Sequence, residues 1–232
     1  MEESELKTSA KQRVAIIVIA LLMLVSVIAG YVAIVVGGSS KTEQISQEKI
    51  QQYEYEYDEK LAEFKKVTAD DFAKFAAQVG RITSYDENAA NDGGVVSHDL
   101  VTGDGRVLEE GDTNYLTYYA GWCADGKVFD SSLDSTENPT AFTRALDASR
   151  GLIVGWNEGV VGMKLGGVRE ITIPGEKAYG TSREICGGYN KPLKFLVMAV
   201  ENADPLRTAA SELDIATSKV QYAMMGIDYE KL

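Results

Sequence analysis

The stretch ADGKVFDSS, residues 124–132, places an aromatic side chain directly beside a carboxylate. Asp125-Gly126 predicts a tight turn, and the run that follows, with Phe129 and Asp130, reads as an extended strand. Strands are poor in aspartate because its charge resists a half-buried surface. Asp130 is therefore either part of a site or a carboxylate that only accepts a hydrogen bond from a neighbouring backbone group or hydroxyl.

The chain has few histidine and cysteine side chains. It contains one histidine, His98, and two cysteines, Cys123 and Cys186. Zinc sites usually take three or four protein ligands, so a zinc site would need all of these residues or additional carboxylates. A Ser-His-Asp triad finds no support either, since Ser131 and Ser132 follow the strand and His98 has no signature around it. We expect no metal and no cofactor.

The net charge argues against one class of partner. The sequence carries 23 basic and 35 acidic residues, a formal net charge of −12. A nucleic-acid partner requires clustered Lys and Arg side chains to neutralise its phosphates, so we expect no nucleic acid. The acidic excess is interpreted as a solvated surface.

Residues 14–36, VAIIVIALLMLVSVIAGYVAIVV, carry no charged side chain. At about 1.5 Å per residue such a helix spans about 35 Å, so we predict a transmembrane helix. A cleaved signal peptide is the alternative, although its apolar region is usually shorter. Lys7, Lys11 and Arg13 precede the stretch, which predicts a cytoplasmic N-terminus of residues 1–13 and a single-pass membrane protein with the remainder extracytoplasmic.

Residues 37–90 are predicted to be a linker and a helical stalk. After the flexible GGSSK, apolar side chains recur at helical spacing. A second helix is expected to begin at Thr68, and Gly80 closes it. The run YEYEY could instead form a strand, but its flanks are helical. The apolar side chains on one face of the first helix, which we call the stalk stripe, are Ile50, Tyr53, Tyr57, Leu61 and Phe64.

Residues 205–232 are predicted to form a C-terminal amphipathic helix. We expect this helix to pack on the stalk stripe as a small helical subdomain, or to pair between chains in self-association. A marginal free helix remains the alternative. Its apolar face comprises Leu213, Ala216, Val220, Ala223 and Ile227.

In residues 91–204 the sequence consists of short runs of alternating apolar and polar residues that are separated by glycines. Such runs are typical of antiparallel strands. The exception is GLIVGWNEGVVGMKLGG, residues 151–167, where Ile153, Trp156 and Val160 recur at helical spacing. The predicted class is α+β, with a curved antiparallel sheet wrapped around one short helix.

Four segments of this region resemble the FKBP family of peptidyl-prolyl cis-trans isomerases, in the family's order. They are TGDGRVLEEGD, YYAGWCADGKVFDSS, IVGWNEGVVGMKLGGVREITIPGEKAYG and LKFLVMAVEN. The resemblance covers about residues 94–203. It implies a five-stranded half-barrel around the helix, with a proline-binding pocket between sheet and helix.

The resemblance also implies which residues form the pocket. Trp156 would be its floor, and Phe142 would lie near its edge. The carried-over catalytic residues are Tyr119, Phe129, Asp130, Ile153, Trp156, Tyr179 and Phe195, and the substrate-binding residues are Phe142, Leu152 and Ile185. Trp156 and Phe195 would also suit a core in almost any fold.

The implied function is isomerisation of X-Pro bonds in polypeptide substrates at the membrane surface. Rotation about the bond breaks amide resonance but no covalent bond, so no nucleophile is needed. Asp130 would accept a hydrogen bond from Tyr119, and Ile153 N–H and the Tyr179 hydroxyl would orient the peptide. The alternative is a non-catalytic FKBP-like chaperone or binding module.

Two departures from the family pattern affect the pocket. Thr140 stands where an aromatic residue is usual, so one wall is expected to be less apolar. The loop TSREICGGYNKP, residues 181–192, is shorter than usual and lacks Ile-Pro-Pro, which leaves Ile185 to cover the substrate. These departures leave macrolide binding open, while the floor of the pocket and the hydrogen-bonding groups are retained.

Cys123 and Cys186 are the only cysteines, and an even count outside the cytoplasm favours a disulfide. Strand alternation from Tyr119 puts Cys123 on the pocket side, and Cys186 lies in the loop expected to hang over it. Two independently buried thiols are the alternative.

Overall fold

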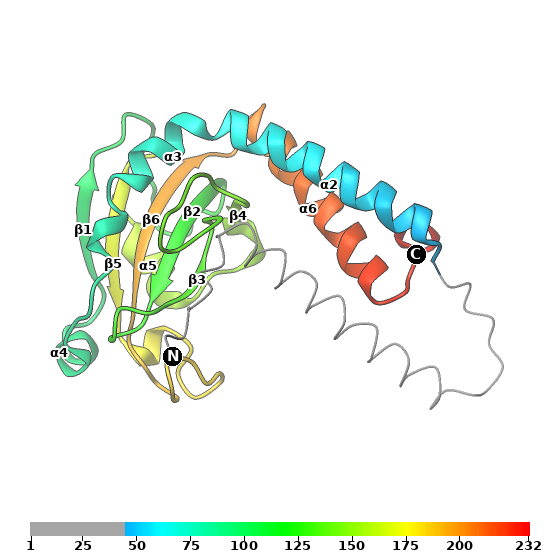
Figure 1. Cartoon of the computed structure of the whole chain (residues 1–232). Helices are drawn as coiled ribbons and strands as arrows, with labels where there is room; N and C mark the ends of the chain where they lie inside the picture. Colours follow the sequence, from blue (N-terminus) through cyan, green and yellow to red (C-terminus); the bar gives the residue numbers. More distant parts are fainter. Residues whose placement is uncertain (1–44) are drawn as a thin grey trace, which may run out of the picture. The chain divides into compact units, whose positions relative to one another are not determined.

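The computed structural model describes residues 45–232 (Figure 1). The predicted transmembrane helix, residues 14–36, and the cytoplasmic residues 1–13 lie outside the described part of the chain. Within residues 45–232, none of the helices combines the length and the apolar character that a membrane span requires. The chain forms two compact units. One comprises residues 56–216, and the described part of the other comprises residues 45–55 and 217–232.

The larger unit is built on an antiparallel sheet with the order β1-β5-β6-β2-β3, and β4 also pairs with β2. This arrangement confirms the predicted α+β class and antiparallel sheet, with β4 added to the five strands that the resemblance implied. The strands are β1 (Val96–Val101), β2 (Tyr115–Trp122), β3 (Val128–Ser131), β4 (Leu146–Asp147), β5 (Val168–Ile173) and β6 (Leu193–Glu201).

Five α-helices and four short 3-10 turns accompany the sheet in the described residues. The run YEYEY lies within the first helix, so the helical interpretation is confirmed. The helices are α2 (Gln47–Val67), α3 (Ala69–Ala76), α4 (Glu87–Asp92), α5 (Val154–Val160) and α6 (Leu206–Met224). The 3-10 turns are η1 (Val79–Arg81), η2 (Ala148–Arg150), η3 (Gly175–Lys177) and η4 (Tyr229–Lys231).

Strand alternation gives the sheet two apolar faces. Tyr118 and Tyr119 are neighbours on the fully buried strand β2 and therefore point to opposite sides. We call the two sets of packed side chains the outer core and the inner core. The outer core includes Phe64, Phe75, Tyr118, Trp122, Phe142, Leu196, Met198 and Leu213. The inner core includes Tyr119, Trp156, Val160, Ile171, Ile173, Phe195 and Val197.

Helix α5 lies close against β5 because two of its positions lack side chains. A Cβ atom at Gly155 would overlap Ile173, and one at Gly159 would overlap Ile171. Any larger residue would push the helix off the sheet. This close approach sets the depth at which Trp156, on the same helix, enters the inner core.

Within residues 56–216 the stalk and C-terminal helices contribute to the outer core. Phe64 of α2 and Leu213 of α6 belong to it, and Lys60 pairs with Glu212 at 2.7 Å. We expected the two helices to form a subdomain of their own or to pair between chains. Here they contact each other within one chain and share a core with the sheet, because their apolar faces meet the aromatic residues of β2.

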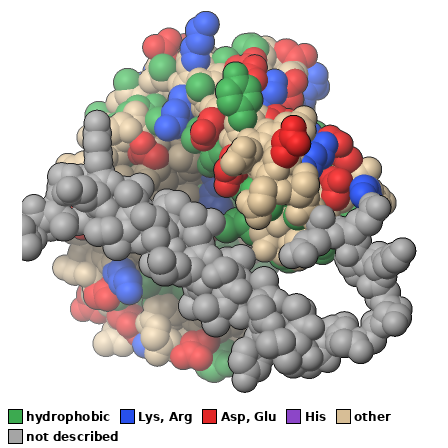
Figure 2. Space-filling view, turned by 45° about the vertical axis from the view of Figure 1, so that its right-hand side comes forward, with side chains coloured by type: hydrophobic (Ala, Val, Ile, Leu, Met, Phe, Trp, Pro, Cys, Tyr) green, Lys and Arg blue, Asp and Glu red, His purple; other side chains and the backbone are tan. Residues whose placement is uncertain are grey.

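The second helix of the stalk begins where expected, after Thr68, but without the expected side-chain cap. The Thr68 hydroxyl instead donates to the carbonyl oxygen of Phe64 at 2.9 Å, at the end of α2. On the molecular face seen in Figure 2, acidic side chains are interspersed with basic ones.

Candidate functional site

Four aromatic side chains from four elements meet in the inner core. Trp156 of α5 contacts Tyr119 of β2 and Phe195 of β6 edge-on, with ring centroids 5.7 and 5.1 Å apart. Phe129 of β3 meets Phe195 edge-on at 5.7 Å. Trp156 is only 3% exposed, whereas Phe129 is half-buried. The rings therefore form an apolar lining that is buried at Trp156 and partly open at Phe129.

Gly121 makes this ring arrangement possible. It lies on β2 between its sheet partners Phe195 and Asp130. A Cβ atom at this position would lie 2.6 Å from Cε1 of Phe195 and 2.7 Å from Cζ of Phe129. Such contacts are too short, so any side chain here would displace a ring. We did not predict Gly121 as a site residue, although a glycine inside a strand is itself a signal of close approach.

The hydrogen bond expected between Tyr119 and Asp130 is present. The Tyr119 hydroxyl donates to Oδ2 of Asp130 at 2.6 Å. Burial, and then this hydrogen bond, raises the pKa of Tyr119 well above its usual value. The tyrosine acts as the donor in this pair. The Asp130 side chain is 48% exposed and lies at the edge of the apolar lining.

Arg144 also binds this pair, and we did not predict it. Its Nη2 atom donates to Asp130 Oδ1 and, at 2.8 Å, to the Tyr119 hydroxyl oxygen. Its Nε atom donates to the carbonyl oxygen of Ser131 at 3.1 Å, and the guanidinium lies over the Tyr119 ring at 5.5 Å. Arg144 stands in FTRALD, outside every motif we used. The only signal for it was that a carboxylate beside apolar residues needs a partner.

The remaining predicted residues border the same lining. Leu152, Ile153, Tyr179 and Ile185 are partly buried and pack against the inner core. Ile153 immediately precedes α5, and no described residue accepts a hydrogen bond from its N–H. The guanidinium of Arg183 lies 4.9 Å from the centre of the Tyr179 ring. The structure thus brings together every predicted site residue except Phe142.

Phe142 was placed wrongly at the edge of the pocket. Its side chain is fully buried in the outer core, stacked on Tyr118 with centroids 4.0 Å apart and touching Phe72 and Phe75 of α3 edge-on. The physical reason is strand alternation, because Tyr118 faces away from the side that Tyr119 lines.

Thr140 does not form a wall of the pocket either. Its N–H donates to Asp134 at 2.9 Å, and its hydroxyl donates to the same carboxylate. Thr140 lines a different groove of about 820 Å³, which it shares with η1 and the turn at Gly126. The departure from the family pattern at this position therefore leaves the aromatic lining unchanged.

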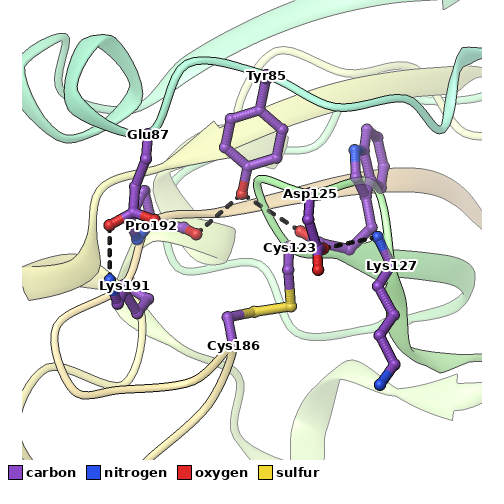
Figure 3. The surroundings of a disulfide bond; sticks show 9 residues. Tyr85, Glu87, Cys123, Asp125, Lys127, Cys186, Lys191 and Pro192 are labelled. Atoms are coloured by element: carbon purple, nitrogen blue, oxygen red, sulfur yellow. Dashed lines mark hydrogen bonds and ion pairs between the residues drawn. A yellow bond between two sulfur atoms is a disulfide. The ribbon is translucent and has the colours of Figure 1, made fainter.

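Cys123 and Cys186 form a disulfide, with Cα atoms 5.5 Å apart (Figure 3). The bond ties the loop of residues 181–192 to the end of β2. Ile185 precedes Cys186 in this loop, and both pack against the inner core. Of the two alternatives for the cysteines, the structure therefore contains the bridge, and the bridge holds Ile185 beside the lining.

Tyr85 supports the base of the same loop. Its hydroxyl donates to the Pro192 carbonyl at 2.9 Å and lies 3.3 Å from the Trp122 carbonyl, between the ends of β2 and β6 (Figure 3). Glu87 pairs with Lys191 at 2.8 Å beside it. The segment before β1 thus braces the loop non-covalently, next to the disulfide.

Among residues 45–232 there is no group of three or more His, Cys, Asp or Glu side chains arranged to hold a metal ion.

Comparison with known proteins agrees with this geometry. The profile of the FKBP-type peptidyl-prolyl cis-trans isomerase family matches residues 105–200. The FK506-binding protein of Neisseria meningitidis serogroup B is 38% identical over 109 residues, which cover 47% of this chain and 94% of the relative. A probable FK506-binding protein of Corynebacterium glutamicum is 37% identical over 86 residues, covering 37% of this chain and 68% of that protein.

Among solved structures, that of FkpA from Escherichia coli is 26% identical with a TM-score of 0.37, and the match covers 76% of this chain and 80% of that one. The family profile spans β2, β3, α5 and most of β6, which supply the aromatic lining and the Tyr119–Asp130 pair. With a relative matched over nearly its whole length, this chain belongs to the FKBP-type peptidyl-prolyl cis-trans isomerase family.

Proposed function

We propose that residues 91–204 catalyse cis–trans isomerisation of X-Pro bonds in polypeptide substrates. The observation that carries this proposal is the aromatic lining of Tyr119, Phe129, Trp156 and Phe195, with the hydrogen-bonded Tyr119–Asp130 pair at its edge. Membership of the family supports the same reaction.

The chemistry requires shape and polarity rather than a nucleophile. Isomerisation crosses a barrier of about 18–20 kcal/mol because the amide C–N bond has partial double-bond character. The twisted amide loses this resonance and is less polar than the planar one. An apolar lining such as Trp156 and Phe195 therefore stabilises the transition state more than the ground state.

Hydrogen-bonding groups around the lining would orient the peptide. The unused N–H of Ile153 is available to a substrate carbonyl, and the Tyr179 hydroxyl would be a second donor. Asp130 would interact with the altered dipole of the twisted amide, and Ile185 on the tethered loop would cover the proline. Holding the peptide in this way lowers the entropy cost of reaching the twisted state.

The experiment is a proline-limited refolding assay with the full chain and its variants Phe129→Ala and Asp130→Ala. Uncatalysed isomerisation takes tens of seconds, so even modest catalysis is measurable. Both variants should slow the catalysed phase strongly. Asp112→Ala is the matched control, because this aspartate also pairs with an arginine, Arg106, outside the lining. Equal rates in the parent and both site variants would refute the assigned site.

A parent that binds proline-containing peptides without accelerating refolding would instead favour the alternative, a non-catalytic chaperone or binding module. The fragment used in any shorter form of the assay should retain residues 56–80 and 206–216. Phe64, Phe75 and Leu213 from these segments belong to the outer core, and their loss would unfold the sheet rather than test the site.

We further propose that the protein is a single-pass membrane protein with its isomerase domain outside the cytoplasm. The uncharged residues 14–36 and the Lys and Arg residues before them support this topology. The disulfide supports it as well, since disulfides persist in oxidising compartments. Digestion of residues 91–204 by protease added to intact cells would support the topology, and protection that ends only on lysis would contradict it.

A further inference from the structure

We propose that Arg144 is a positioning residue for the reaction: it fixes the Asp130 carboxylate and the Tyr119 hydroxyl in one orientation at the edge of the aromatic lining. This inference rests on the proposed isomerase function. It starts from the observation that Arg144 holds three oxygen atoms, those of Tyr119, Asp130 and Ser131.

The two carboxylate oxygens of Asp130 have different partners. Oδ2 accepts from the Tyr119 hydroxyl at 2.6 Å, and Oδ1 accepts from Nη2 of Arg144. With only one of these bonds the carboxylate could rotate about the bond to Cβ, because its side chain is 48% exposed and water could satisfy the other oxygen. Both bonds together define a single plane for it.

Arg144 also defines the direction of the Tyr119 hydroxyl. The hydroxyl oxygen accepts from Nη2 at 2.8 Å while its proton is donated to Asp130. A hydroxyl that accepts from a cation and donates to an anion has one favoured rotamer. Tyr119 therefore presents a fixed dipole to the lining.

The guanidinium group suits this task better than an ammonium would. Its planar group reaches Asp130 and Tyr119 through Nη2 and the Ser131 carbonyl through Nε at 3.1 Å, so two of its three nitrogens are held. Its position over the Tyr119 ring, 5.5 Å from the ring centre, adds a stacking contact. A lysine could reach one of these oxygens but would not keep the planar arrangement.

The expected consequence is a loss of turnover rather than of substrate affinity. The residues that would contact the proline, Trp156 and Phe195, pack on each other edge-on and belong to the inner core, so they should remain in place when Arg144 is replaced. Orientation of the polar pair matters in the twisted state, so Arg144→Ala should lower kcat by about tenfold to a hundredfold with little change in KM. Arg144→Lys should recover only part of this loss.

Chemical rescue separates positioning from structural support. Added guanidinium ion at about 50 mM, far below unfolding concentrations, should restore part of the kcat of Arg144→Ala, whereas NaCl at equal ionic strength should not. Guanidinium should not rescue Asp130→Ala, since its binding partner is then absent. Arg106→Ala is the matched control, because Arg106 also joins a carboxylate, Asp112, to a backbone carbonyl, that of Asn114, away from the lining.

The result that would overturn the inference is an Arg144→Ala variant with the kcat of the parent, or one whose loss is matched by Arg106→Ala. A spectroscopic measurement keeps the test independent of activity. The carboxyl ¹³C signal of Asp130 and the ring signals of Tyr119 should shift in Arg144→Ala and stay fixed in Arg106→Ala. An inactive parent would refute the proposed function, whereas unchanged signals in Arg144→Ala would refute the positioning role.

Discussion

The rings of Tyr118 and Phe142 stack face to face, with centroids 4.0 Å apart and planes inclined by 9°. The next residue along β2, Tyr119, contacts Trp156 on the other side of the sheet. Two adjacent tyrosines thus serve separate purposes, because one completes the outer core and the other borders the aromatic lining. Stability and activity should therefore respond separately to substitutions on the two sides.

Phe142→Ala should destabilise the protein without changing the site. Removing a fully buried phenylalanine typically costs about 3–5 kcal/mol in the free energy of unfolding. Denaturant unfolding measures this cost, and the KM of the folded variant should match that of the parent. Phe129→Ala, at a half-buried position of the lining, should instead reduce activity strongly and change the free energy of unfolding less. A raised KM with unchanged stability in Phe142→Ala would contradict this assignment.

Gly121→Ala should reduce activity while the sheet stays folded. The added methyl group would lie 2.6 Å from Phe195, so that ring or Phe129 must move and the lining loses its shape. We expect a loss of kcat/KM of about tenfold or more. Gly80→Ala is the control, because a Cβ atom there meets nothing within 4 Å. Parent-like activity in Gly121→Ala would show that the ring contacts are not needed.

Loss of the Cys123–Cys186 disulfide should lower stability and loosen the loop over the lining. On the chain-entropy account, closing a loop of 63 residues stabilises the folded state by about 4 kcal/mol. The double substitution Cys123→Ser with Cys186→Ser should reduce the free energy of unfolding by an amount of this order. It should also raise KM, since Ile185 is no longer tethered beside the inner core.

Reduction of the parent with dithiothreitol should reproduce both effects and should leave the double variant unchanged. The Tyr85 brace remains in either case, so the loop should keep its base. A KM that is the same in reduced and oxidised protein would mean that Ile185 does not cover the substrate.

Ordered motifs were enough to predict most of the candidate site. Phe129, Asp130 and Trp156 occur in segments whose spacing matches the family, so their neighbourhood follows from the fold. Phe142 was misplaced because it lies outside the strands of the sheet, in an isolated bridge with Leu133, where residue alternation along a strand does not reveal the side that a residue faces. Arg144 was missed because it lies in an irregular segment between β3 and β4. No local sequence pattern predicts that a residue of such a segment contacts Tyr119 and Asp130.

The stalk shows the same limit. Helical spacing correctly predicted that α2 and α6 are amphipathic, since spacing reports which residues share a face. It carried no information on what covers that face. Phe64 and Leu213 cover β2 because aromatic residues fill the outer side of that strand, which only the assembled sheet reveals.

The last prediction concerns the unit formed by residues 45–55 and 217–232. The hydroxyl of the buried Tyr53 donates to Asp228 at 2.6 Å. Burial, followed by this hydrogen bond, raises the pKa of Tyr53 from 10.0 to about 12. The hydrogen bond from Tyr53 holds the pKa of Asp228 below its usual range. The Tyr53–Asp228 hydrogen bond contributes to both shifts, so together they predict how the stability of this unit depends on pH.

The stabilisation should be complete between the ordinary pKa values of the two groups, about 4 and about 10. As pH falls below about 4, the folded state must protonate Asp228 at its lowered pKa, so the contribution is lost. As pH rises from 10.0 to about 12, the unfolded state releases the Tyr53 proton first, and the contribution is lost again. Tyr53→Phe should therefore differ most from the parent near pH 7 and least at both extremes, as measured by proteolysis rates of the C-terminal residues.

Asp228→Asn is the control. Its side chain keeps an oxygen acceptor but does not titrate in acid, so this variant should lack only the loss of stability at low pH. A constant difference between Tyr53→Phe and the parent across the whole range would show that the hydrogen bond contributes nothing that titrates.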